Sequence, residues 1–408
     1  MRWPNALRLP VDVLAVLSVT IAGSFGNGAV APLLGDIRES FGVSFAAMGL
    51  LTSGFAMARI LVDLPGGSLA DRVQPRTLFY TGTVIAMAGV ALTAMAPVFA
   101  VLLVGRILNG LGASLGSIAA MAYVSRATRP AERGKALGAA SAATQTGGSL
   151  SPAVVGLAAS IADWRVGMAL TIVPLVGALL VVRLYVAKVS FGSAPRRARR
   201  RGVIGMVYAP RRLLPVSVLT VLISLSIFGF KAALLPLYGT EGLKLDAAVV
   251  GIAITLSTAL RMPVSIASGS ISDRYGRIAV FVPGALLMAL VSILVPLSPN
   301  AVLYVAFTAI YAFGGSTSPM VNAMVVDRAS KDRLGAALGT NAFFRDVAIV
   351  GMPVALGAVM DAGGFLTAGA VLAGFALTAA VVALVIGDTS DRASGRRAAK
   401  SPASDAGR

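Results

Sequence analysis

The chain has 408 residues, of which 57% are hydrophobic and only 13% are charged. Soluble domains carry roughly 25% charged residues, so this composition excludes a water-soluble protein and indicates an integral membrane protein. The sequence has no cysteine and no histidine, which excludes disulfides, thiolate metal sites and proton transfer through imidazole. Proton chemistry is therefore left to Asp, Glu or Tyr, and no metal or other cofactor is expected.

Twelve apolar segments long enough to cross a bilayer, which takes about 20 residues, follow one another in two sets of six. The first set covers residues 11–34, 46–70, 77–96, 98–124, 135–160 and 165–188, and the second covers 214–239, 247–271, 278–298, 300–326, 335–359 and 364–387. Because backbone polar groups in lipid need internal partners, and no strand-like alternation occurs, all twelve are predicted to be helices. The expected fold class is an all-α membrane protein.

The expected domains follow from this division. Residues 1–190 form an N-terminal six-helix bundle and residues 214–387 a C-terminal one. Between them, residues 191–213 form a basic cytoplasmic linker broken by Pro and Gly, and residues 388–408 form a disordered cytoplasmic tail rich in Ser, Ala and Arg.

The net charge of +18 is unevenly distributed along the chain. With the amino terminus inside, 27 of the 35 Lys and Arg residues lie in inner segments and only Arg38, Arg165 and Lys244 lie in outer loops. This bias predicts that both termini are cytoplasmic. Since the positive charge reflects topology, it gives no reason to expect nucleic-acid binding.

The two halves repeat one another. Arg59 and Arg261 each precede a hairpin aspartate, Asp71 or Asp273, by twelve residues, and the offset between the pairs is 202. Segments 124–127 and 326–329 correspond at the same offset. In the first helix of each half, Pro32 pairs with Pro236, which sets Asn27 opposite Lys231. Random apolar sequences would not match in the spacing of charge, Pro and Gly. Parallel six-helix repeats are an architecture of secondary transporters.

Four short segments carry a resemblance to the major facilitator superfamily. GGSLADRVQPR at 66–76 and GSISDRYGR at 269–277 resemble its signature loops between helices 2 and 3 and between 8 and 9. The first copy departs from the pattern, with Gln74 and Pro75 in place of Gly and Arg. GRILNGLG at 105–112 resembles the fourth-helix signature, and SPAVVG at 151–156 is a weak likeness of the fifth-helix antiporter signature. The likeness is to bacterial proton-coupled efflux members, and it implies a twelve-helix transporter.

The resemblance implies that the two loops act as a conformational gate that latches the bundles when the cavity opens outward. The alternative is a tight, positively charged turn. The glycines of the loops allow close contact between helices. The loop aspartates lie at the cytoplasmic mouth, where a carboxylate can face the amino-terminal end of a neighbouring helix. The expected gate residues are Gly67, Asp71, Arg72, Arg76, Gly269, Asp273, Arg274, Gly276 and Arg277.

Five cations and two acids lie within the apolar segments, a surplus of three positive charges. Each costs at least about 2.5–3.5 kcal/mol at mid-membrane, so each needs a partner or a wet cavity. Asp63 follows Arg59 by four residues and shares its helix face, so the two form an internal ion pair or Asp63 carries protons. Arg345 and Asp346 are expected on different sides of their helix, unable to cancel one another, which makes Asp346 the second candidate proton carrier.

The remaining substrate or coupling candidates are Arg106, Arg261, Lys231, Asn27, Gln145 and Tyr311. Arg106 is either structural or part of the coupling, and Lys231 either faces the cavity or extends to the outer interface. For Gln145 and Tyr311 the alternative to a cavity position is ordinary helix packing, which is favoured.

These observations predict a secondary active transporter that moves a small molecule by alternating access. No phosphate-binding loop of the GxxxxGK[ST] type occurs, so an ion gradient rather than ATP is the expected energy source. Proton-coupled export is the leading hypothesis. The alternative is proton-coupled or facilitated uptake of an organic anion or other polar metabolite. An enzyme is not expected, because no nucleophile and base or set of metal ligands faces another in the membrane. The expected partners are a small-molecule substrate, protons and the lipid bilayer, with the chain a monomer in the bacterial inner membrane.

Overall fold

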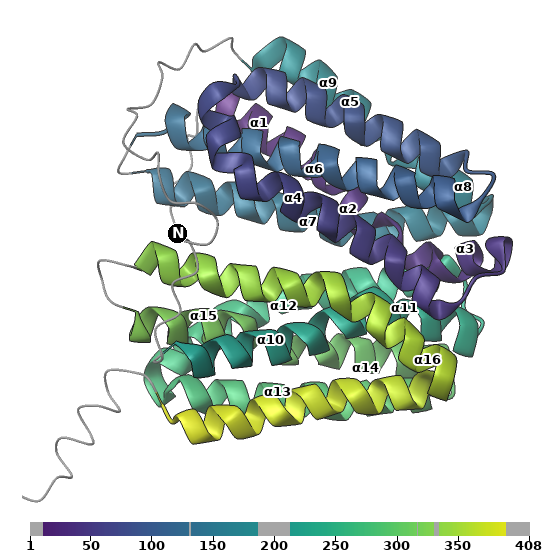
Figure 1. The fold of residues 1–408 in the computed structure, drawn as a ribbon, viewed down its shortest axis with the longest axis vertical. Coiled ribbons are helices and arrows are strands. Elements are labelled where there is room, and N and C mark those ends of the chain that lie inside the picture. The colour runs from purple at the N-terminus through teal and green to yellow at the C-terminus, as the bar shows by residue number, and fades with distance from the viewer. Residues whose placement is uncertain (1–10, 130–131, 187–212, 316, 330–333, 389–408) are drawn as a thin grey trace, which may run out of the picture. The chain divides into compact units, whose positions relative to one another are not determined.

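A computed structural model of the chain describes residues 11–129, 132–186, 213–315, 317–329 and 334–388, with the side chains at 64–68, 71 and 334–336 left out. This part of the chain is helical and contains no strand, as the sequence predicts (Figure 1). It divides into two compact units. The first comprises Met1–Arg200 with Gly239–Thr255, and the second comprises Arg201–Tyr238 with Leu256–Arg408. Residues 191–212 of the expected linker lie outside the described residues.

The first unit is built on four long helices. They are α4 (Phe45–Arg72), α5 (Pro75–Ala94), α6 (Phe99–Ala127) and α7 (Arg133–Ile161), with α6 packed against both α4 and α5. The other helices are α1 (Val11–Ser24), α2 (Gly26–Ala29), the 3₁₀ turn η1 (Ala31–Leu33), α3 (Leu34–Phe41), α8 (Trp164–Leu170) and α9 (Ile172–Tyr185). The short helices α1 to α3 follow one another almost without a break, so together they form one apolar span, Val11–Phe41.

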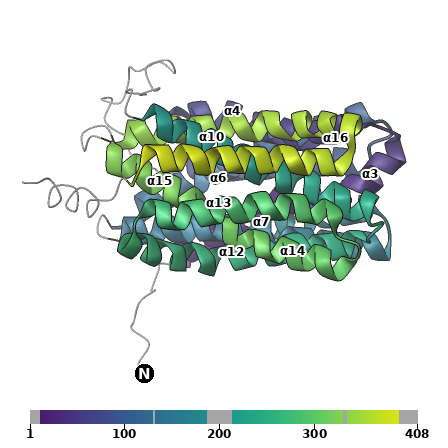
Figure 2. The ribbon, with the colours of Figure 1, turned by 90° about the horizontal axis from the view of Figure 1, so that it is seen from below.

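In the second unit α16 (Leu334–Ile386) packs against α10 (Leu214–Gly229) and α13 (Arg277–Leu294), and the three run side by side in Figure 2. The other elements that lie wholly within it are the π-helical turn η4 (Phe230–Leu234), α11 (Leu235–Leu237), η6 (Val295–Leu297), α14 (Ala301–Gly314) and α15 (Thr317–Arg328). The π-helical turn η5 (Tyr238–Gly242) and the long helix α12 (Ala247–Tyr275) run across the chain positions at which the units divide.

Ten segments of the described residues are long and apolar enough to cross a membrane. The last, Ala337–Ile386, is interrupted at Gly364, whose φ of 76° and ψ of −177° end one helix and begin another. The polar 29-residue helix α7 is not among the ten. Counting α7 and dividing α16 at Gly364 gives the twelve helices that the sequence predicts. The chain is therefore a multi-pass membrane protein.

Local sequence signals place the helix ends. Ser44 caps α4, its hydroxyl accepting a hydrogen bond from Ala47 N at 3.2 Å, and Asn300 caps α14 by accepting one from Leu303 N at 3.0 Å. Gly42 ends α3 in the left-handed region at φ 62°. Pro75 begins α5, where its missing N–H costs nothing. These residues therefore fix where the helices begin and end.

The pair α5 and α6 is held together by small residues. A Cβ on Gly105 would lie 2.8 Å from Thr93 N, and one on Gly112 would lie 2.8 Å from Ala86 Cα. Glycine at these positions lets the two backbones touch, which is how helices associate in lipid. Gly116, one turn after Gly112, has open space at the same place.

Gly112→Ala is therefore expected to lower the thermal unfolding midpoint of the detergent-purified protein by several degrees. The added methyl group forces α5 and α6 apart, and overpacking costs about 1–3 kcal/mol. Gly116→Ala is the matched control, and we expect an unchanged or slightly higher midpoint, since alanine favours a helix over glycine. Equal midpoints for the two variants would contradict this account of the helix pair.

Candidate functional site

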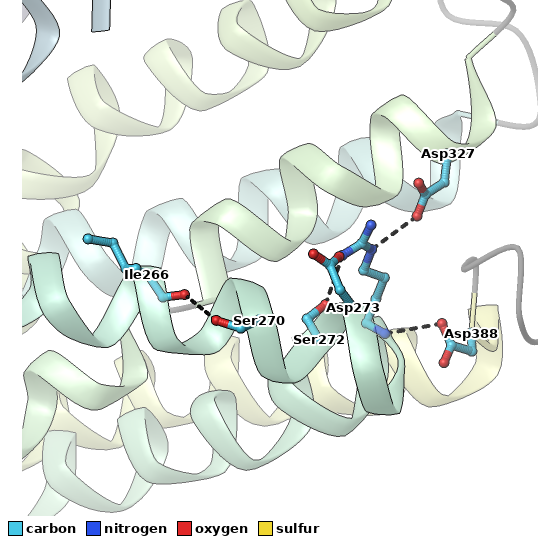
Figure 3. Close-up of polar contacts among 7 residues, drawn as sticks. Ile266, Ser270, Ser272, Asp273, Asp327 and Asp388 are labelled. Carbon is cyan, nitrogen blue, oxygen red and sulfur yellow. Dashed lines mark hydrogen bonds and ion pairs between the residues drawn. The ribbon is translucent and has the colours of Figure 1, made fainter. Parts of the chain in front are cut away.

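Arg277 is the centre of an ionic network at the junction of α12 and α13. Its partners Ser272, Asp273, Asp327 and Asp388 are labelled in Figure 3. Its guanidinium lies 2.6 Å from Asp273 Oδ1 and 3.2 Å from Asp327 Oδ2, and it donates to Ser272 Oγ at 3.0 Å. Arg277 and Asp327 are mostly buried, at 17% and 20% exposure, whereas Asp273 is 70% exposed. The network joins the end of α12 to the end of α15.

The same junction is tied to the chain that follows α16. Asp388 Oδ1 accepts a hydrogen bond from the backbone N of Arg277 at 3.2 Å. Gly276, the residue before Arg277, has a φ of 104°, and a Cβ there would overlap the Asp388 carboxylate. This position therefore requires glycine. Asp388, the first residue of the expected tail, follows the left-handed Gly387 that ends α16 and contacts the signature loop; residues 389–408 of that tail lie outside the described residues.

The first signature loop is built differently. Helix α4 continues through Gly67 and Asp71, whose side chains lie outside the described residues. Arg72 is exposed, and Arg76 donates to the Arg183 carbonyl at 3.2 Å. Arg126, on α6, donates to the Ala70 carbonyl at 3.1 Å. The hydrogen bonds described for Arg76 and Arg126 in this loop thus go to backbone carbonyls, and Arg76 also lies 5.8 Å from the centre of the Tyr80 ring.

The repeat explains the difference. At the offset of 202 residues, Pro75 corresponds to Arg277 and Ser125 corresponds to Asp327. Both partners of the second-half ion pair are thus replaced in the first half. Losing one partner alone would leave a poorly solvated charge, which is more costly than losing both. Of the other second-loop residues, Arg274 and Gly269 show no part in the described ionic network: Arg274 is exposed beside the Tyr275 ring, and a Cβ on Gly269 would meet nothing.

Asp63 contacts α6 rather than Arg59. Its carboxylate accepts a short hydrogen bond from the Ser114 hydroxyl, while no ion pair joins it to Arg59 among the described residues. Arg59 is partly buried. Of the two alternatives for Asp63, the internal ion pair with Arg59 is not seen. The carboxylate is hydrogen-bonded to the Ser114 hydroxyl instead.

Arg106 lies in the core of the first unit and is 2% exposed. Its guanidinium donates to the Gly26 carbonyl and to Asn109 Oδ1, both at 3.4 Å, and stacks over the Phe55 ring at 4.7 Å. Its Nε atom has no hydrogen-bond partner. The arginine thus ties α6 to α2 and α4, and its charge is balanced by dipoles and an aromatic face rather than by a carboxylate.

Lys231 and Arg261 lie near one another in the second unit. Lys231 Nζ donates to Thr258 Oγ1 at 3.0 Å, and Thr258 precedes Arg261 by three residues on α12. Thr258 is eleven residues after the start of α12, about 16 Å along its axis. Lys231 thus contacts the middle of a membrane-spanning helix. Its side chain does not extend to the outer interface, which was one of the two alternatives.

The expectation for Arg345 and Asp346 was wrong. Both side chains lie on the exterior of α16, and Arg345 Nη2 is 3.0 Å from Asp346 Oδ1. Successive helix positions do point in different directions, but the arginine side chain is long enough to bend around the helix surface to its neighbour. The pair is half-exposed, and the two charges do offset one another.

The other three polar candidates differ from one another. Tyr311 is buried, stacks on Phe230 at 3.7 Å between ring centroids, and donates to the Ser226 carbonyl at 3.2 Å, which agrees with helix packing. Gln145 is exposed on α7. Asn27 is partly buried, and its Oδ1 has no hydrogen-bond partner. Asn27 is thus the one of the three with unused hydrogen-bonding capacity inside its unit.

A cavity of about 400 Å³ within the first unit contains none of the predicted site residues. It is lined by residues of α3, the end of α7, the start of α8 and the segment 240–247. Its acidic lining residues are Asp36, Glu39, Asp163, Glu241 and Asp246. Glu241 pairs there with Arg38 at 3.0 Å.

Sequence reasoning also missed Ser114, Thr258 and Asp388 as partners of the candidate residues. The signal for Asp388 was the Gly-Asp pair that ends the last apolar run. Ser114 and Thr258 carry no signal of their own, because hydroxyl residues are common throughout these helices.

Comparison with known proteins decides the family. A model described as "Major Facilitator Superfamily" matches residues 16–353 and 216–405. The chain belongs to the major facilitator superfamily. This family is one of transporters, which agrees with the duplicated helices and the paired signature loops.

Two curated relatives of this superfamily member carry resistance names. It is 23% identical over 371 residues to the "Tetracycline resistance protein, class C" of Escherichia coli, covering 89% of the chain and 91% of that protein. It is 24% identical over 136 residues to the "Quinolone resistance protein NorA" of Staphylococcus aureus. The second match spans about a third of each protein: 33% of this chain and 35% of the relative.

Solved structures of the superfamily share the fold. A bacterial homologue of the human lysosomal transporter Spinster, in an inward-facing and occupied conformation, superposes with a TM-score of 0.75 at 16% identity, covering 92% of this chain and 96% of that one. The nucleoside transporter NupG gives a TM-score of 0.75 at 13% identity, with 92% and 99% covered. At these identities the likeness shows the fold alone.

Proposed function

We propose that this superfamily member exports a small molecule in exchange for protons by alternating access. The observation that carries the proposal is the carboxylate of Asp63 within the membrane-spanning helix α4, held by the Ser114 hydroxyl and by no cation among the described residues. A carboxylate at this depth is costly when charged, and taking up a proton removes that cost.

Ser114 suits a group that changes its protonation state. A hydroxyl donates to an ionised carboxylate and accepts from a protonated one, so it can hold Asp63 in both states. A proton crossing 100 mV gains about 2.3 kcal/mol, which is the energy available for moving substrate.

The direction of transport rests on the relatives. The tetracycline resistance protein aligns with nearly the whole chain, and a membrane protein can confer resistance by removing the compound from the cell. Export is therefore the direction proposed here. Asp346 is the weaker proton carrier, because Arg345 already offsets its charge.

The two signature loops are proposed to gate this cycle, with the network around Arg277 as the stronger half. The domain boundaries expected from the sequence and a monomeric state belong to the same proposal. The charge bias supports cytoplasmic termini, and the bacterial relatives support a position in the inner membrane.

The test is transport by the purified protein in liposomes that contain a trapped pH-sensitive dye. With an imposed pH gradient, we expect tetracycline, a quinolone, citrate or p-aminohippurate to change the proton flux relative to protein-free liposomes. We further expect accumulation of the active compound to stop when a proton ionophore is added. Transport that is indifferent to the ionophore would contradict proton coupling.

One observation favours the alternative, which is uptake of an organic anion. Lys231 and Arg261 are two basic side chains that lie near one another in the second unit. Whole cells separate the directions: cells that express the protein should retain less labelled compound than controls if it exports, and more if it imports. The comparison uses the same compound with and without the ionophore.

A further inference from the structure

The second unit holds two positive groups on adjoining elements. Lys231 lies in the π-helical turn η4 and donates to Thr258 of α12 at 3.0 Å. Arg261 lies three residues after Thr258, so the two share a face of α12. The hydrogen bond to Thr258 therefore brings Lys231 to the face of α12 that carries Arg261.

The fold makes room for this pair. Arg261 packs over Gly315, at the end of α14, where a Cβ would lie 2.6 Å from Arg261 Cδ. Phe230, beside Lys231, is fixed by its stack on Tyr311, whose hydroxyl is anchored on Ser226. Turns of the π type occur frequently at functional sites in helices. Both cations are thus carried by packed elements rather than by loops.

Among the described residues, neither Lys231 nor Arg261 forms an ion pair with an acid. Asp273, Asp327 and Asp388 contact Arg277, and Asp346 contacts Arg345. The hydrogen bond of Lys231 goes to a neutral hydroxyl, and no hydrogen bond or ion pair is recorded for the Arg261 guanidinium among the described residues. Two like charges at membrane depth without a carboxylate are unfavourable, because buried charges need a counter-charge.

We propose that Lys231 and Arg261 bind the negative group of the transported molecule, a carboxylate or phosphate oxygen of a soluble organic anion. This inference rests on the proposed transport function and names its substrate class. The arginine fork can take two oxygens of such a group, while the lysine ammonium supplies a point charge. Thr258 orients the lysine. When the anion leaves, Lys231 and Arg261 again repel one another. This repulsion favours a change of conformation in the empty protein.

Binding without a gradient tests the site separately from transport. The detergent-purified protein is heated with citrate, glycerol 3-phosphate or p-aminohippurate, and with glycerol and choline as neutral and cationic probes. We expect at least one anion to raise the unfolding midpoint in a saturable manner, and the other two probes to leave it unchanged. Lys231→Gln and Arg261→Gln should each lower the affinity for that anion at least about tenfold, since charge-assisted hydrogen bonds are lost.

Two further variants keep the result interpretable. Lys231→Arg retains the charge and should retain binding. Lys244→Gln removes a cation that is 77% exposed and pairs with Glu241, and it should change nothing. Unchanged anion affinity in Lys231→Gln and Arg261→Gln would overturn the site, as would stabilisation by glycerol or choline alone or by none of the anions. Stabilisation by phosphatidylglycerol alone, lost in both variants, would assign the cations to a lipid headgroup and reject the substrate class. If the unmodified protein binds the anion but its transport is not coupled to protons, the proposed function would be overturned and the anion site would stand.

Discussion

Asp63→Asn is expected to reduce proton-coupled transport to the level of protein-free liposomes. Asparagine keeps the size of the side chain and can still bond to Ser114, but it takes up no proton. Without a group that alternates between charged and neutral, the pH gradient has nothing to act on. The measurement is substrate-driven change in the trapped dye under an imposed pH gradient, with the protein amount matched by gel.

Three companion variants sharpen this result. Asp63→Glu retains a titratable group and should restore part of the proton flux. Asp346→Asn separates the two candidate carriers, and we expect it to retain coupling because Arg345 already offsets that charge. Asp361→Asn changes an exposed acid on α16 and serves as the matched control. Coupling that survives Asp63→Asn together with Asp346→Asn would remove both carboxylates from the proposed mechanism.

Arg277→Gln is expected to lower the transport rate by about one to two orders of magnitude while the protein remains folded. The change breaks the mostly buried contact with Asp327, and hydrogen bonds to charged groups contribute about 1.5–3 kcal/mol. The exposed contact with Asp273 adds little. If the network forms in one conformation of the cycle, its loss shifts that equilibrium by about 5- to 150-fold.

The control for Arg277 is its neighbour Arg274, which is exposed beside the Tyr275 ring. Arg274→Gln should transport at nearly the normal rate. Asp327→Asn should resemble Arg277→Gln, and the double variant should be no worse than either, because residues of one network are not additive. A normal rate in Arg277→Gln, with a normal elution profile, would exclude the gate role.

The first-half loop provides an internal comparison. Arg76 donates to a single backbone carbonyl, and Pro75 and Ser125 stand where the second half has Arg277 and Asp327. Arg76→Gln is therefore expected to reduce transport less than Arg277→Gln. The sequence already shows the loss of the arginine in the signature, but its joint loss with the aspartate is visible only once Asp327 is known to be the partner.

Apolar runs and the repeat were sufficient for much of the fold. They predicted twelve helices, and the structure agrees once α16 is divided at Gly364. The apolar content of a segment decides whether it can span the bilayer, and this is a property of each segment by itself. The helix α7 shows the limit of that measure: residues 135–160 were counted among the apolar segments, yet α7 is not one of the ten described helices that are apolar enough to cross a membrane.

The pairing of charged side chains was harder to predict. Arg59 and Asp63 have favourable spacing, yet Asp63 contacts Ser114, 51 residues away. Arg345 and Asp346 have unfavourable spacing, yet they form an ion pair. Helical spacing states which side chains share a face, but the partner chosen depends on what neighbouring helices present and on how far a long side chain can bend.

The sequence by itself determined that this is a duplicated, helical membrane protein with signature loops of the superfamily. These properties are local, since each helix must satisfy its own backbone in lipid. Only the tertiary structure decided that Arg277 joins Asp327 and Asp388, that Ser114 holds Asp63, and that Lys231 contacts Thr258, one turn from Arg261. Such contacts join residues up to 111 positions apart, so they exist only after the helices have packed.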